Sequence, residues 1–150
     1  DGYQGFIFPW QVSEEESEAT IARTATHPRM MIASDGIYNV AHSHPRSQGC
    51  FARVLGEFVR ERASISLKEA VYKMSGFPAE RFRLGSRGRI RKGYAADLAL
   101  FDPETVAAGS TFENPAQGPV GIQHVIVNGE PVIRDESPTP ARPGKVIRRS

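Results

Sequence analysis

The apolar and polar positions at the start of the chain predict a strand, a helix and a second strand. The apolar run 5–10 indicates a buried strand. A Ser-x-x-Glu capping box at Ser13 predicts a helix over 14–25. A second apolar run, 30–34, reads as a strand that ends at Asp35. A strand–helix–strand unit within about 30 residues implies a parallel sheet.

Helical spacing dominates the middle of the chain. Apolar residues recur at that spacing over 51–62, which predicts an amphipathic helix. A second capping box at Ser66 predicts a helix that continues to about Gly76. Pro78 suits the first residue of a further short helix over 78–83.

Strand-like runs replace the helical pattern after Gly93. They cover 96–101, 122–127 and 131–134, and the last two flank Asn128-Gly129, which is a strong hairpin signal. Residues 145–149 could add an edge strand. The pattern therefore divides the chain into an α/β layer over 1–85 and a small antiparallel β unit over 93–150.

Composition limits the classes of protein to which the chain can belong. With 150 residues, 39% of them hydrophobic, it suits one domain or two small ones and is not disordered throughout. No apolar run approaches the roughly 20 residues that cross a bilayer, so we expect no membrane partner. A single cysteine, Cys50, cannot form an internal disulfide, which favours a reducing, cytoplasmic location. The chain starts at Asp1 without a signal-peptide pattern, and we therefore expect it to be either trimmed or a piece of a longer protein.

The charge is unevenly distributed. Residues 81–150 carry 11 basic and 7 acidic residues, and much of the excess lies between Arg81 and Lys92. Nucleic-acid binding would call for a recognised fold or interleaved aromatic residues, and only Phe82 and Tyr94 are near. A solvated connector is the favoured interpretation, so we expect no nucleic-acid partner.

Asp35 is the most informative candidate for chemistry. It lies at the carboxyl end of a predicted parallel strand, where α/β sheets and barrels place their active sites. A carboxylate there can act as a general base or bind a metal. Asp-Gly also favours a simple turn, and spacing alone supports the turn more strongly.

The loop after Asp35 holds the next candidates. His42 and His44 alternate, and on a strand they could share a metal. No apolar strand precedes them and a proline follows, so a loop is favoured, and the chain has no CxxC or HExxH spacing. Arg46 could bind a substrate carboxylate with its guanidinium fork, although a lone loop arginine is more often simply exposed.

The remaining candidates read as structural. Cys50 has no nearby base in sequence and suits a small buried apolar role. His124 lies inside a strand run. The glycine-rich segment 85–93 lacks the strand-then-helix setting of a phosphate loop.

A series of short motifs follows in order along nearly the whole chain. They are His27-Pro-Arg-Met-Met-Ile-Ala-Ser-Asp35-Gly36, His44-Pro-Arg46, Phe51-Ala-Arg-Val-Leu-Gly-Glu-Phe-Val-Arg60, Ser66-Leu-Lys-Glu-Ala70, Pro78-Ala-Glu-Arg-Phe82, Ala96-Asp-Leu98, Phe101-Asp-Pro-Glu-Thr105, Thr111-Phe-Glu-Asn-Pro115 and Val127-Asn-Gly129. This series resembles the C-terminal half of the N-acyl-D-amino-acid deacylases (D-aminoacylases) of the amidohydrolase superfamily. The motifs Phe101-Asp-Pro-Glu-Thr105 and Thr111-Phe-Glu-Asn-Pro115 are the more specific to that family.

The resemblance implies an α/β fold: the C-terminal part of a TIM barrel followed by a small antiparallel β-sandwich unit. Residues 4–10 and 30–34 would match the seventh and eighth barrel strands. Residues 1–92 would then belong to the metal-dependent hydrolase barrel. Residues 93–150 would belong to the composite sandwich domain.

The resemblance also implies roles for two residues. Asp35 matches the family's acid, which takes a proton from the water that attacks the amide carbonyl and delivers it to the leaving amine. Arg46 matches the arginine that pairs with the substrate α-carboxylate. Zinc would acidify that water and polarise the carbonyl. The family's other metal ligands, a His-x-His pair, a cysteine and two later histidines, have no match in this chain, so Asp35 is at most a weak metal ligand here. The chain also departs from the family at Cys50, where the family often has threonine.

Two alternatives to an N-acyl-D-amino-acid deacylase stay open. One is a related amidohydrolase that acts on cyclic amides or other N-acyl compounds, since a fold does not fix a substrate. The other is a non-catalytic fragment that is stable only by association, because exposed strands near 4–10 and 30–34 would favour self-association.

Overall fold

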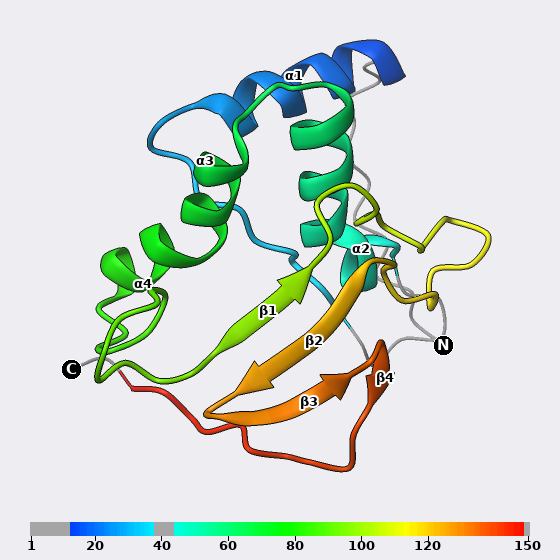
Figure 1. The fold of residues 1–150 in the computed structure, drawn as a ribbon. Helices are drawn as coiled ribbons and strands as arrows, with labels where there is room; N and C mark the ends of the chain where they lie inside the picture. The colour runs from blue at the N-terminus through cyan, green and yellow to red at the C-terminus, as the bar shows by residue number, and fades with distance from the viewer. Residues whose placement is uncertain (1–12, 38–43, 149–150) are drawn as a thin grey trace, which may run out of the picture.

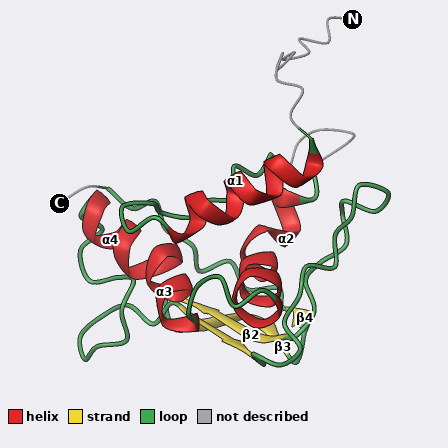
Figure 2. Ribbon diagram, turned by 90° about the horizontal axis from the view of Figure 1, so that it is seen from above, coloured by secondary structure: helices red, strands yellow, loops and turns green. Residues whose placement is uncertain are grey.

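Helices form one layer of the molecule and an antiparallel sheet forms the other (Figure 1). The computed structural model describes residues 13–37 and 44–148. In the view of Figure 2, which is turned by 90° from Figure 1, the helices lie on one side of the sheet. None of the helices in these two ranges is long and apolar enough to cross a membrane.

The first helix, α1 (Glu14–Thr26), confirms the prediction for 14–25. Its N-terminus is a capping box: the Ser13 hydroxyl accepts a hydrogen bond from the Glu16 N–H at 3.2 Å, and the Glu16 carboxylate accepts one from the Ser13 N–H at 3.1 Å. The helix ends at His27, where the following proline disfavours helical backbone.

The predicted helix over 51–62 starts earlier than its apolar pattern indicates. Helix α2 (Arg46–Arg53) begins directly after Pro45 and continues as the π-helical segment η1 (Val54–Glu61). In a π-helix each N–H donates to the carbonyl five residues earlier, as the Arg62 N–H does to the Glu57 carbonyl at 2.8 Å.

The next helices are continuous, whereas two separate helices were predicted. Helix α3 (Leu67–Val71) begins at its Ser66 cap and passes through η2 (Tyr72–Gly76) into α4 (Phe77–Phe82). The predicted end at about Gly76 agrees with the end of η2, and the short helix predicted over 78–83 corresponds to α4, which begins one residue earlier. Pro78 lies in the first turn of α4, where its fixed φ suits helical backbone, although its missing N–H leaves one hydrogen bond of the continuous helix unmade.

The sheet has four antiparallel strands in sequential order: β1 (Leu98–Phe101), β2 (Ile122–Val127), β3 (Glu130–Arg134) and β4 (Ser137–Pro138). The hairpin predicted at Asn128-Gly129 is confirmed. Both of these residues have positive φ, 48° and 85°, as a tight primed turn requires.

Three strand predictions have other outcomes. The run 30–34 is not a strand in this structure: Ile32 hydrogen-bonds to a helix residue, Lys73, and an apolar run without a paired neighbour forms no ladder. Residues 145–148 are likewise not strand, so the predicted edge strand over 145–149 is wrong there, and residue 149 lies outside the described part. The predicted strand over 5–10 also lies outside the described residues.

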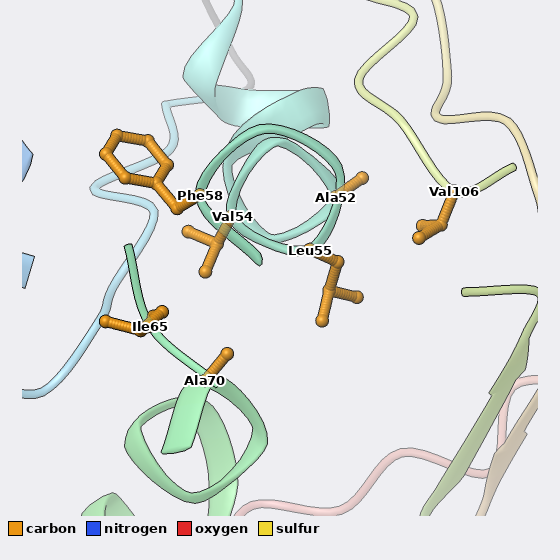
Figure 3. Close-up of a cluster of buried hydrophobic side chains, with 7 residues drawn as sticks. All are labelled: Ala52, Val54, Leu55, Phe58, Ile65, Ala70 and Val106. Carbon is orange, nitrogen blue, oxygen red and sulfur yellow. The ribbon is translucent and has the colours of Figure 1, made fainter. Parts of the chain in front are cut away.

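The hydrophobic core is centred in the helical layer, around α2 and η1, and extends to Val106 on the side of the sheet (Figure 3). Phe58 of η1 is 3% exposed, and Val106, in the connection after β1, is 1% exposed. The cluster also includes Ala52, Val54, Leu55, Ile65 and Ala70. The carbonyl of Val106 accepts a hydrogen bond from Arg60 Nη1 at 2.7 Å, which further fixes the connection on the helical layer.

Candidate functional site

The segment that carries Asp35 is held from the helical layer. The Ile32 N–H donates to the carbonyl of Lys73 at 3.1 Å. The ammonium of Lys73, whose residue is only 2% exposed, donates to the carbonyls of His27 and Met30, the latter at 3.3 Å. One residue of η2 thus fixes three points of the segment that leads to Asp35.

Asp35 itself combines a turn with an exposed carboxylate. Its φ of 49° is left-handed, a conformation that aspartate tolerates better than most residues. The Gly36 N–H donates to the Ser34 hydroxyl at 3.3 Å and stabilises the bend. The Asp35 side chain is 82% exposed. The turn interpretation and the chemical one are therefore compatible.

Arg46, the first residue of α2, binds Asp35 at two points. Its Nη2 lies 2.9 Å from Asp35 Oδ2, and its Nε donates to the Asp35 carbonyl at 3.0 Å. Nη1 makes no hydrogen bond to the described residues, and the arginine side chain is 40% exposed. The structure thus brings together the two residues for which the sequence suggested roles.

His44 supports the start of α2. Its Nδ1 accepts a hydrogen bond from the Arg46 N–H at 3.1 Å, and its ring meets Phe112 edge-on at 5.1 Å between centroids. Desolvation and, to a smaller extent, the charge of Arg46 lower the pKa of His44 below its ordinary value. The loop predicted for His44 is confirmed, and His42 lies outside the described residues.

Ser47 is a site-supporting residue that the sequence did not reveal. Its buried hydroxyl accepts from the Ile37 N–H at 3.2 Å and donates to the Ile37 carbonyl at 3.3 Å. Next to it, the Cys50 thiol donates to the Ala33 carbonyl at 3.5 Å. Burial raises the pKa of Cys50, as expected for a packing residue. A serine signals such a role only once the fold has placed it.

The basic cluster is largely engaged in contacts within the chain. Arg87 pairs with Asp97 and donates to Asn128 Oδ1 at 2.6 Å. Arg89 pairs with Glu80, and Arg91 lies over a tyrosine ring at 5.8 Å. The sequence favoured a solvated connector; in the structure Arg89 is half exposed, whereas Arg87 is 19% exposed and ties the connector to the sheet unit.

His124 also has a structural role. Its Nδ1 accepts a hydrogen bond from the Asp135 N–H at 3.2 Å, across the β2–β3 hairpin. This agrees with its placement inside a strand run.

The described residues do not form a metal site by themselves. Over 13–37 and 44–148, no three His, Cys, Asp or Glu side chains are grouped so that they could hold an ion. A zinc site takes at least three protein ligands, and Asp35 could supply one oxygen at most.

A family model described as "Amidohydrolase family" matches residues 13–133. The chain belongs to the amidohydrolase family. Two curated relatives come from Alcaligenes xylosoxydans xylosoxydans. An N-acyl-D-glutamate deacylase is 43% identical over 132 residues, which are 88% of this chain and 27% of the relative. A D-aminoacylase is 42% identical over 133 residues, which are 89% of this chain and 28% of the relative.

Solved structures of the amidohydrolase family show the same relationship. A D-aminoacylase structure superimposes with a TM-score of 0.86 at 42% identity and covers 88% of this chain and 28% of its own. The N-acyl-D-glutamate deacylase of Bordetella bronchiseptica, solved with zinc and a phosphonate inhibitor, gives 0.82 at 43% identity, covering 87% of this chain and 27% of its own. The chain thus spans little more than a quarter of the length of these relatives.

Proposed function

We propose that this amidohydrolase-family chain is the C-terminal segment of a zinc-dependent deacylase that removes the acyl group from N-acyl-D-amino acids. Relatives with that activity in their names, at 42–43% identity over most of the chain, support the proposal. We expect the 150 residues alone to be inactive, because their described part lacks a zinc site.

The contact between Arg46 and Asp35 is the observation that carries the proposal. In an N-acyl amino acid the scissile nitrogen and the carboxylate carbon are both bonded to the α-carbon, so they lie only about 2.5 Å apart. A carboxylate bound to Arg46 would therefore bring the scissile amide close to the Asp35 carboxylate, which is 2.9 Å from the same guanidinium. One residue would bind the substrate and the other would act on the neighbouring bond.

The roles of the two side chains follow from their chemistry. Nη1 of Arg46, which has no hydrogen-bond partner among the described residues, would donate to a substrate carboxylate. Asp35 would accept the proton of the attacking water through an oxygen and transfer it to the leaving amine. Zinc would polarise the carbonyl and acidify the water, with Asp35 as at most one of its ligands.

A domain division goes with this function. Residues 1–92 would complete a TIM barrel, and 93–150 would belong to a β-sandwich. The amidohydrolase-family match and the antiparallel sheet over Leu98–Pro138 support this division. Asp35 and Arg46 would then lie at one end of the barrel, where TIM-barrel enzymes place their active sites.

The function is tested by Asp35→Asn in the intact deacylase. Loss of a general base typically lowers kcat by about 10²–10⁴-fold, and we expect a decrease in that range with unchanged circular dichroism. Asp135→Asn is a matched control, because Asp135 is also left-handed, with φ of 50°, and its side chain is 84% exposed. Full activity in Asp35→Asn would exclude Asp35 from the mechanism.

A substrate panel distinguishes the alternatives. N-acetyl-D-amino acids carry the free carboxylate that Arg46 suits, whereas hydantoins and dihydropyrimidines do not. We expect hydrolysis of the former, and preference for the cyclic amides would favour the related amidohydrolase.

Sedimentation of the isolated chain tests self-association, and the cytoplasmic location stays a prediction.

A further inference from the structure

We infer that residues 108–112, in the connection between β1 and β2, position Arg46 for the substrate carboxylate. This inference rests on the proposed function of Arg46 and adds to it the element that holds the arginine in place. Three contacts between this connection, termed the positioning loop, and the start of α2 carry the inference.

The first contact is a hydrogen bond at the residue before Arg46. The Ser110 hydroxyl donates to the carbonyl of Pro45 at 2.8 Å. That carbonyl also accepts from the Gly49 N–H at 2.9 Å, so Ser110 binds the carbonyl that starts the helix. The two residues are 65 positions apart in sequence, and the contact fixes the first turn of α2 on the sheet unit.

The second contact is a close packing at Gly49, on the turn that follows Arg46. A Cβ added there would lie 2.4 Å from Ser110 Oγ and 2.9 Å from the Cβ of Ala108, both closer than side chains pack. Gly49 therefore permits an approach that any other residue would prevent.

The third contact reaches the residue two positions before Arg46. The Phe112 ring packs edge-on against His44, whose Nδ1 accepts from the N–H of Arg46. The positioning loop thus touches the chain on both sides of the arginine, and the guanidinium touches Asp35. A small displacement of this loop would move the guanidinium relative to the scissile bond.

The inference is tested by comparing KM for a substrate that has the α-carboxylate with KM for one that lacks it. In the intact deacylase, Ser110→Ala and Gly49→Ala should raise KM for an N-acetyl-D-amino acid by about three- to tenfold, as expected for one lost hydrogen bond, with a smaller change in kcat. The corresponding amino-acid amide, which lacks the carboxylate, should show no such increase. A purely structural role would affect both substrates equally.

Gly56→Ala is the matched control. A Cβ at Gly56 would lie 2.7 Å from the carbonyl oxygen of Val106, so this variant strains the same connection away from Arg46. We expect Gly56→Ala to lower the melting temperature and to raise KM less than Gly49→Ala does, because its strain falls before the positioning loop. An equal rise in KM for Gly56→Ala and Gly49→Ala would overturn the inference.

A double-mutant cycle separates this inference from the proposed function. Ser110→Ala should have no further effect on KM in an Arg46→Ala background, because its effect acts through the arginine. If Arg46→Ala raises KM but Ser110→Ala adds its full effect on top, only the inference fails. If Arg46→Ala leaves KM unchanged, the proposed role of Arg46 fails and the inference with it.

Discussion

At the scale of single residues, the structure turns two separate sequence candidates into one arrangement. Asp35 and Arg46 are eleven positions apart, and each had an ordinary alternative: a turn and an exposed arginine. Their contact through both a side-chain and a main-chain oxygen gives each a defined neighbour. A guanidinium fork makes such a double contact more readily than a lysine ammonium.

That geometry predicts how substitutions of Arg46 differ. Arg46→Lys keeps the charge but loses the planar fork, so we expect KM for N-acetyl-D-amino acids to rise about tenfold. Arg46→Ala should raise KM further, with kcat changing less than KM in both variants. Steady-state kinetics of the intact deacylase measure this order. Equal KM values for the lysine variant and the wild type would show that charge alone suffices.

At the scale of secondary-structure elements, capping signals in the sequence predicted where α1 and α3 begin, but local patterns did not predict the full extent of α2. The caps at Ser13 and Ser66 predicted the N-termini of α1 and α3, because a cap depends on four consecutive residues. The early start of α2 depends on long-range contacts of Ser47 and Gly49, which no local pattern contains.

Strand predictions show the same limit. The Asn128-Gly129 turn was predictable because its backbone strongly prefers those residues. The turn at Asp135-Glu136, with φ of 50° and 62°, has no glycine, and it was missed together with β4. The run 30–34 has the composition of a strand, but strand pairing depends on neighbours rather than on composition.

The cap at Ser66 gives a stability prediction for the α3 helix. Its hydroxyl accepts from the Glu69 N–H at 3.2 Å, so Ser66→Ala leaves that donor without its cap. We expect a loss of about 1 kcal/mol in the free energy of unfolding. Ser66→Asp keeps an acceptor and should stay within a few tenths of a kcal/mol of the wild type. Urea unfolding measures both, and equal losses in the two variants would contradict a capping role.

At the scale of the whole molecule, charged groups join α1 to the rest of the helical layer. Glu18 of α1 binds Arg53 at 2.9 Å and Arg62 at 3.0 Å, and both arginines also pair with Glu57. The guanidinium groups of both arginines lie over the Phe58 ring as well. The attachment of α1 was not predictable from sequence, because the partners lie 35 or more residues apart.

This ionic attachment makes the stability of the molecule depend on pH. The hydrogen bond from Arg53, together with the charges of both arginines, lowers the pKa of Glu18 below its ordinary value of 4.5 despite some desolvation. A carboxyl whose pKa falls on folding stabilises the native state above the unfolded pKa, and the gain disappears as pH falls through the folded pKa. Glu18 should therefore stabilise the fold at neutral pH and stop doing so in acid.

We expect Glu18→Gln to lower the free energy of unfolding by about 0.2–1 kcal/mol at pH 7, the range typical of ion pairs that are partly exposed to solvent. The difference from the wild type should shrink below pH 4.5 and vanish once the wild-type carboxyl is protonated. Glu15→Gln is the control, since it makes the same charge change on an exposed position of the same helix. Denaturant unfolding across this pH range measures both variants. A Glu18→Gln difference that does not change with pH would show that the side chain stabilises α1 by packing rather than by charge.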